Sequence, residues 1–142
     1  LEVRDLHVNY GPIQALRGVD VDVQQGEIIT AIGANGAGKS TLMMTLSGVL
    51  KPVSGKIRFL GERIDGRSSH LIVRAGLIQV PEGRRVFPLL TVDDNLAAGA
   101  LSRNSRSEIA RDRDWVFSLF PRLMERSRQM AGTLSGGEQQ ML

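Results

Sequence analysis

The sequence predicts an α/β fold in which a glycine-rich turn joins a buried strand to a helix. Residues 27–32 (EIITAI) form a short apolar run that is typical of a buried strand. Residues 40–50 (STLMMTLSGVL) repeat apolar side chains at helical spacing, which predicts one apolar face from Leu42 to Leu50. The sequence before these two segments alternates like strands, whereas the sequence after about residue 83 carries helix-capping patterns.

Strand patterns surround the glycine-rich turn. Residues 1–10 alternate apolar and polar with one slip in phase, which predicts an edge strand with a bulge. A Gly-Pro turn follows at residues 11–12, and residues 19–23 (VDVDV) predict a half-buried strand. We therefore expect a mixed sheet with antiparallel N-terminal strands. Further short patterns predict strands over residues 56–60 and 76–80 and a helical turn over residues 68–74.

The second half of the sequence predicts helices. Thr91 is placed to cap one helix, and a capping box at Ser105 and Glu108 opens a longer helix that Pro121 ends. We expect Trp115 on that helix to pack in the core. The predicted domains are an α/β core over residues 1–82 and a helical subdomain over residues 83–142.

Composition excludes several classes of protein. The 142 residues are 42% hydrophobic without any long apolar run, so we expect a soluble protein with no membrane-spanning helix and no secretory signal. There is no cysteine for disulfides or thiolate metal sites, and His7 and His70 are too few for a zinc site. With 4% aromatics, the net charge of +3 predicts a solvated basic surface and no nucleic-acid partner, with anionic ligands or headgroups as possible secondary partners.

A phosphate loop over residues 33–41 (GANGAGKST) carries the clearest chemistry. Its spacing matches G-x-x-x-x-G-K-[ST], and glycines let backbone N–H groups face phosphate oxygens. Lys39 can reach the β- and γ-phosphates, and the Ser40 hydroxyl suits Mg²⁺. A chance glycine-rich turn is the alternative, which the strand–loop–helix setting disfavours. The expected nucleotide-binding residues of the loop are Gly33, Asn35, Gly36, Ala37, Gly38, Lys39, Ser40 and Thr41.

A signature segment over residues 134–138 (LSGGE) is the second motif. Ser135 and Glu138 form a capping box, so a plain helix start is one interpretation. Glycines at a helix start also leave N–H groups bare for an anion. The two motifs could bind two ends of one triphosphate, or two nucleotides in a paired assembly.

Together these motifs resemble those of ABC-type ATPases over the whole chain. The LSGGEQQ pattern, the phosphate loop, Tyr10 and Gln79 stand in the order of that family. The resemblance implies an ABC-type P-loop fold that binds ATP and Mg²⁺. It implies that Tyr10 stacks on adenine, that Lys39 and Gln79 are catalytic, and that Ser40 and Gln79 hold Mg²⁺. It also implies that the chain forms a dimer with a second ATPase subunit. In this dimer, the ATP bound by the second subunit would contact Ser135, Gly136, Gly137 and Glu138 of this chain.

A finer resemblance follows Gln79. The stretch PEGRRVFP at residues 81–88 is similar to ATP-binding subunits of branched-chain amino-acid importers, with urea-importer ATPases as nearest competitors. It implies ATP hydrolysis at the cytoplasmic face of a bacterial inner membrane, and an indirect link to a substrate-binding protein. The residues implied to contact the membrane-spanning permease subunits are Glu82, Arg84, Arg85 and Phe87.

One departure from the family is large. The sequence has no Walker B strand ending in a Mg²⁺-binding Asp, no catalytic Glu after it and no switch His, so we expect this part of the core to be absent. Both ends of the sequence lie inside predicted elements and we expect them to be cut. We expect the 142-residue chain alone to be poorly stable and to hydrolyse ATP negligibly. The alternatives are a non-hydrolysing nucleotide-binding module and an ABC-type ATPase of DNA repair or translation.

Overall fold

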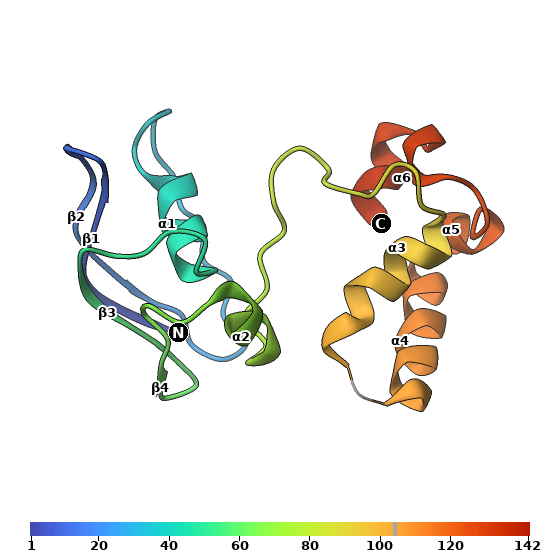
Figure 1. Ribbon diagram of the computed structural model, residues 1–142, viewed down its shortest axis with the longest axis horizontal. Coiled ribbons are helices and arrows are strands. Elements are labelled where there is room, and N and C mark those ends of the chain that lie inside the picture. Colours follow the sequence, from blue (N-terminus) through green and yellow to red (C-terminus); the bar gives the residue numbers. More distant parts are fainter. Residues whose placement is uncertain (104) are drawn as a thin grey trace. The chain divides into compact units, whose positions relative to one another are not determined.

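The chain folds as two compact units. The computed structural model describes residues 1–103 and 105–142. An N-terminal unit covers Leu1–Gln79 and a C-terminal unit covers Val80–Leu142 (Figure 1). The division between the units falls after Gln79, whereas the sequence pattern predicts a domain boundary after residue 82.

The N-terminal unit contains an antiparallel sheet. Its strands are β1 (Glu2–Tyr10), β2 (Ile13–Asp22), β3 (Ser54–Phe59) and β4 (Glu62–Arg63), in the order β2-β1-β3-β4. The predicted bulge in β1 is confirmed by register shifts, and Asp5 within them has a φ of 47°. The prediction that this strand lies at an edge is wrong, because β3 pairs with the side of β1 that β2 leaves open.

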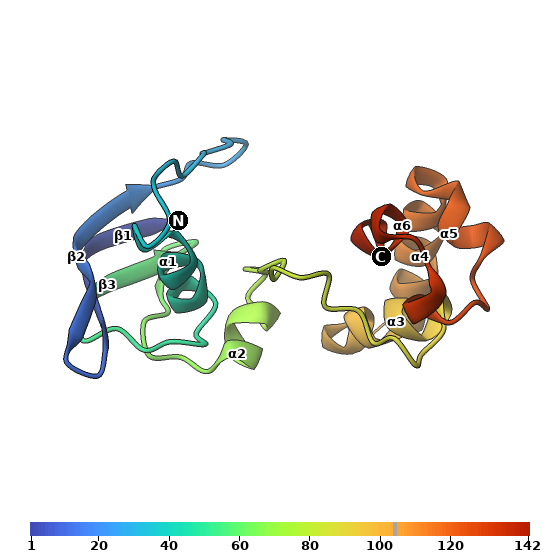
Figure 2. The same ribbon diagram turned by 90° about the horizontal axis from the view of Figure 1, so that it is seen from above.

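Helix α1 (Lys39–Leu46) packs against this sheet, and α2 (Ser69–Arg74) follows β4 in the chain (Figure 2). Leu42 and Leu46 of α1 are buried, as predicted. The helix ends four residues before the predicted end at residue 50, because Gly48 turns the backbone with a φ of +73°. The buried core of this unit comprises Val3, Leu6, Val8, Leu16, Leu42, Leu46, Ile57, Ile64 and Ile72.

Two predicted strands do not form. Residues 27–32 and 76–80 have no strand structure, and Ile28 and Ile32 are 94% and 91% exposed. An apolar run becomes a strand only when neighbouring strands pair with its backbone. Among residues 1–103 and 105–142, no strand pairs with either segment. The observed sheet is therefore antiparallel throughout, and the predicted mixed sheet is wrong for it.

The C-terminal unit is helical. It contains α3 (Val92–Gly99), η1 (Ala100–Ser102), α4 (Arg106–Leu119), α5 (Pro121–Glu125), η2 (Ala131–Thr133) and α6 (Gly136–Met141). Helices α3 and α4 lie side by side in both views (Figures 1 and 2). A small core is formed by Val92, Leu123, Ala131 and Leu134, and Leu96 of α3 and Val116 of α4 pack against it.

Thr91 caps α3 and Ser105 caps α4, as predicted, although α4 has only the Ser105 half of its predicted capping box; one core prediction is wrong. The Thr91 hydroxyl accepts the Asp94 N–H at 3.1 Å, and the Ser105 hydroxyl accepts the Glu108 N–H at 3.3 Å. Trp115 is 63% exposed, because the core contacts of α4 come from Val116 and the residue after it instead. A membrane-spanning helix would need a longer apolar stretch than any helix within the described part of the chain has.

Candidate nucleotide-binding site

Gly38 of the phosphate loop lies against β2. Gly38 is the N-cap of α1 and has a φ of 92°. A Cβ atom there would lie 2.6 Å from Cδ2 of Leu16 and 3.1 Å from the carbonyl oxygen of Ala15. Only glycine fits both this backbone conformation and this close approach. The start of α1 is thereby fixed against the buried side chain of Leu16.

The ammonium group of Lys39 lies across the phosphate loop. Its Nζ donates hydrogen bonds to the carbonyl oxygens of Gly33 at 2.7 Å and Ala34 at 2.9 Å. Within the loop, the Ala37 N–H donates a hydrogen bond to the Ala34 carbonyl oxygen at 3.1 Å and closes a turn over residues 34–37. A cation held by two neutral carbonyls can exchange them for phosphate oxygens, which form stronger charge-assisted bonds.

The first turn of α1 faces the same loop. The positive end of the helix dipole and the Lys39 charge both favour an anion at this position. Ser40 is exposed on this turn, where its hydroxyl can serve as a ligand for a hard cation. The side chain of Thr41 is buried against the core, so of this residue only the backbone is suited to contact a ligand.

Gln79 lies at the opposite end of α1 from Ser40. Its Oε1 accepts a hydrogen bond of 2.6 Å from the hydroxyl of Ser47, the C-cap of α1. The seven residues from Ser40 to Ser47 correspond to about 10 Å along a helix axis. The structure therefore does not bring the two predicted Mg²⁺ ligands together. Within the described ranges, no cluster of three or more His, Cys, Asp or Glu could hold a metal ion.

Tyr10 lies at the end of β1, in the same unit as the phosphate loop. Its ring is exposed beside the turn at Gly11 and Pro12, opposite Ile13 of β2. An exposed ring at a hairpin can stack on a planar base. Its predicted contact with adenine stays a prediction.

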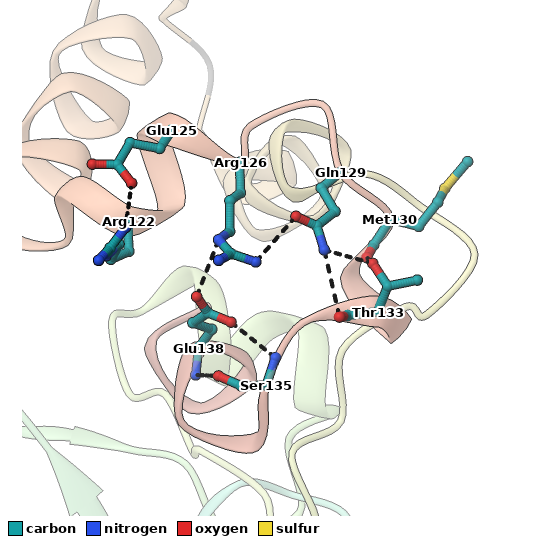
Figure 3. A network of polar contacts seen from close by, with 8 residues as sticks. All are labelled: Arg122, Glu125, Arg126, Gln129, Met130, Thr133, Ser135 and Glu138. Carbon is teal, nitrogen blue, oxygen red and sulfur yellow. Dashed lines mark hydrogen bonds and ion pairs between the residues drawn. The ribbon is translucent and has the colours of Figure 1, made fainter.

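The signature segment lies in the C-terminal unit and begins α6. The Ser135 hydroxyl accepts the Glu138 N–H at 3.4 Å, and Glu138 Oε2 accepts the Ser135 N–H at 2.9 Å, so the predicted capping box is confirmed (Figure 3). The Glu138 side chain is 14% exposed and also pairs with Arg126. Hydrogen bonds from Ser135, then the charges of Arg126 and Arg122, hold the pKa of Glu138 below its ordinary value against partial desolvation.

Arg84 packs on the signature segment. A Cβ atom on Gly136 would lie 2.8 Å from Cζ of the Arg84 guanidinium, whereas one on Gly137 would have no atom within 4 Å. Arg84 adopts a left-handed backbone conformation with a φ of 49°. The structure thus places a residue predicted to contact a permease subunit against a glycine of the signature segment.

Asn95 of α3 fixes the backbone of Phe87, another of the predicted permease contacts. Its Oδ1 accepts the Phe87 N–H at 2.8 Å and its Nδ2 donates to the Phe87 carbonyl at 3.1 Å, while the Phe87 ring stays exposed. Nearby, Nε of Arg85 donates to the Glu82 carbonyl at 3.2 Å. The sequence predicted no role for Asn95, although an asparagine inside a helix, where its propensity is poor, is a usable signal.

Known proteins resemble the chain along its length. The sequence profile of the ABC transporter family matches residues 16–142. A high-affinity branched-chain amino acid transport ATP-binding protein, BraG of Pseudomonas aeruginosa, is 56% identical over 133 residues, which are 94% of this chain and 57% of BraG. A probable branched-chain amino acid transport ATP-binding protein, LivF of Archaeoglobus fulgidus, is 36% identical over 96% of this chain and 58% of its own length.

Solved structures agree with these relatives. The structure of an ATP binding subunit of an ABC transporter superposes with a TM-score of 0.87 at 30% identity, covering 99% of this chain and 57% of that one. An ATP-binding cassette of an ABC transporter in its ADP conformation superposes with a TM-score of 0.76 at 26% identity, covering 99% of this chain and 60% of that one.

The chain thus spans less than two thirds of the length of these relatives. The structural likeness confirms the predicted α/β P-loop fold of ABC type. The relatives do not favour the alternatives of a non-hydrolysing module or a urea-importer ATPase. With the family profile matching from residue 16 to residue 142, the chain belongs to the ABC transporter family.

Proposed function

We propose that the chain is the nucleotide-binding part of an ATPase that drives import of branched-chain amino acids. The observation that carries this proposal is the Lys39 ammonium, held inside a glycine loop at the start of α1. The similarity to BraG, whose name states branched-chain amino acid transport, supports the substrate.

The geometry of the phosphate loop supports ATP binding. Lys39 would exchange the Gly33 and Ala34 carbonyls for β- and γ-phosphate oxygens, and the loop N–H groups would hold the remaining oxygens. Tyr10 would stack on adenine. In phosphoryl transfer the protein mainly positions the phosphates and stabilises their charge, so these contacts would be the contribution of this unit.

Mg²⁺ is part of the proposed site. Ser40 fits it, because this exposed residue carries a hydroxyl and lies on the first turn of α1 beside the loop. Gln79 fits it only after it has left Ser47. When bound, the ion would neutralise charge on the phosphate oxygens.

The C-terminal unit would provide the contacts to other subunits. Ser135 and its neighbouring residues Gly136, Gly137 and Glu138 would contact ATP bound by a second ATPase subunit in a dimer. The exposed Phe87, with Glu82, Arg84 and Arg85, would contact permease subunits at the cytoplasmic face of a bacterial inner membrane. A substrate-binding protein would be coupled only through the permease.

Leucine uptake tests the proposal. Residues 1–142 replace the corresponding part of BraG in cells that lack BraG, and uptake of radiolabelled leucine is measured. We expect the hybrid protein to restore uptake, the Lys39→Ala hybrid to fail, and the Lys51→Ala hybrid, altered at an exposed lysine outside the loop, to restore it. A hybrid that is expressed at the level of BraG without restoring uptake would contradict the assigned substrate.

A further inference from the structure

Arg126 connects two parts of the C-terminal unit that meet at the signature segment. It is the C-cap of α5. Its Nε pairs with Glu138 Oε1 at 3.2 Å, and its Nη1 donates to Gln129 Oε1 at 3.4 Å (Figure 3). One planar guanidinium therefore contacts both α6 and the loop that follows α5.

Gln129, the first partner of Arg126, in turn contacts the residues just before the signature segment. Gln129 Nε2 donates to the Thr133 hydroxyl at 2.8 Å, and that hydroxyl donates to the Met130 carbonyl at 2.8 Å. Thr133 ends η2 and directly precedes Leu134, which is buried in the core. These contacts therefore fix the entry of the chain into the signature segment.

Glu138, the second partner of Arg126, fixes the start of α6 itself. The carboxylate uses Oε2 to accept the Ser135 N–H and Oε1 to pair with Arg126. A carboxylate held at both oxygens cannot rotate away from Ser135, whereas one held at a single oxygen can. The ion pair thus restricts the capping box to one geometry.

From these contacts we infer that Arg126 is a positioning residue for the signature segment: it holds the backbone of Ser135 and the Glu138 carboxylate in the orientation seen here. Its importance for catalysis rests on the proposed function, in which Ser135 and the adjoining glycines contact ATP bound by a second subunit. Arg126 itself contacts Glu138 and Gln129, so it acts through them.

Arg122 provides a matched control on the same helix. Its Nη1 pairs with Glu125 at 2.9 Å, and both side chains are more than half exposed. Figure 3 shows this pair apart from the contacts of Arg126 with Glu138 and Gln129. Arg122→Gln removes the same charge as Arg126→Gln. The charge of Arg122 also acts on Glu138, but the substitution leaves the direct contacts of Glu138 with Ser135 and Arg126 in place, so the pair of variants separates charge from contact.

Amide hydrogen exchange of the 142-residue chain tests the positioning directly. We expect Arg126→Gln to speed exchange at the Ser135 and Glu138 amides by about fivefold, the effect of weakening one cap. Arg126→Lys should restore part of the protection, because a lysine can pair with Glu138 but cannot form the fork that also reaches Gln129. Arg122→Gln should exchange like the wild type. Equal protection in Arg126→Gln and the wild type would overturn the inference.

Two binding measurements separate this inference from the proposed function. Affinity for a fluorescent ATP analogue should be the same in the wild type and Arg126→Gln, because the phosphate loop lies in the other unit. Association of two copies with a slowly hydrolysed ATP analogue, measured by sedimentation, should fall about fivefold in Arg126→Gln and recover in part in Arg126→Lys. If the wild type does not associate, the proposed role of the signature segment fails, and the exchange rates still decide whether Arg126 positions it. If the wild type and Arg126→Gln associate equally, Arg126 has no positioning role for the proposed contact.

Discussion

Ser47 donates a hydrogen bond of 2.6 Å to Gln79 and holds that side chain at the C-terminal end of α1. The same hydroxyl also lies 3.1 Å from the Met44 carbonyl, so it is fixed within the last turn of the helix. Gln79 must break this contact and move by about 10 Å, the length of seven helical residues, to reach an ion at Ser40. The structure thus shows Gln79 in a position that does not contribute to the expected metal site.

Ser47→Ala should strengthen the Mg²⁺ dependence of ATP binding. The released hydrogen bond is worth about 0.5–1.5 kcal/mol, so the ratio of ATP affinities with and without Mg²⁺ should rise about 2- to 10-fold. The measurement is a titration with a fluorescent ATP analogue in Mg²⁺ and again in a chelator. A second substitution, Gln79→Ala, should cancel the gain.

The control for this experiment is Thr45→Val. Thr45 also has a buried hydroxyl on α1, but that hydroxyl donates to the Thr41 carbonyl at 2.7 Å and not to Gln79. In Thr45→Val, the ratio of ATP affinities with and without Mg²⁺ should equal that of the wild type. A Ser47→Ala ratio no larger than this control would show that Gln79 is not restrained by Ser47.

Gly136→Ala should displace the Arg84 side chain without unfolding the C-terminal unit. The added methyl group would contact the guanidinium, which is the flexible end of a long side chain and can move. The free energy of unfolding should change by less than about 1 kcal/mol, because alanine is also the better helix former. The NMR signal of the Arg84 Nε–H group should shift, whereas Gly137→Ala, which has open space, should leave it unchanged. Equal shifts in both variants would contradict the observed packing.

Gly55→Ala should strongly destabilise the N-terminal unit. A Cβ atom at Gly55 would lie 2.7 Å from Cα of Leu6 in β1, and the φ of Gly55 is +105°. Backbone cannot move aside as a side chain can, so left-handed strain and overpacking together should cost about 2–5 kcal/mol. Gly61→Ala has a φ of +83° but open space, and should cost only about 1–2 kcal/mol. Urea unfolding measures both, and equal losses would be inconsistent with the tight packing at Gly55.

Asp65 should make the stability of the N-terminal unit dependent on acid pH. Its side chain is 11% exposed and accepts hydrogen bonds from Arg63 Nε at 2.9 Å and from the Ile57 N–H at 3.0 Å. The hydrogen bond from Arg63, then that from Ile57 and the Arg63 charge, lower the pKa of Asp65, while desolvation opposes them. A carboxyl whose pKa is lower in the folded than in the unfolded state stabilises the fold above its unfolded pKa of about 3.9, and this contribution is lost as pH falls through the folded pKa.

Asp65→Asn should therefore lower the free energy of unfolding at pH 7 by about 1.5–3 kcal/mol, the range for hydrogen bonds to a charged group. The difference from the wild type should shrink as pH falls below about 4. Glu62→Gln, which breaks an exposed ion pair with Arg67, should have a small effect at either pH. A difference between Asp65→Asn and the wild type that stays constant from pH 7 to pH 3 would contradict the assigned role.

Local patterns could be predicted from the sequence because their partners are close in the chain. The N-cap of α3 at Thr91, the capping box that begins α6 and the glycine–lysine spacing of the phosphate loop depend on residues three to six positions apart. Each was therefore visible in the residue types alone. The alternating valines of β2 were also visible, because a half-buried strand repeats every second residue.

Contacts between distant residues could not be predicted in the same way. Residues 27–32 have the composition of a strand, but strand formation also needs partners, which the described part of the chain does not provide. The central position of β1 depends on β3, more than 40 residues later. Ser47 and Gln79 are 32 residues apart, and the type of either residue does not predict a contact with the other. Arg126 likewise resembled any surface arginine until the fold placed it against Glu138.

ATP binding by the 142-residue chain tests the central claim most directly. The measurement is the affinity of a fluorescent ATP analogue for the wild type, Lys39→Ala and Lys51→Ala. Hydrogen bonds from a charged group are worth about 1.5–3 kcal/mol, so Lys39→Ala should bind about 10- to 100-fold more weakly, and Lys51→Ala should bind like the wild type. Equal affinity in the wild type and Lys39→Ala would contradict the assignment of residues 33–41 as the nucleotide site.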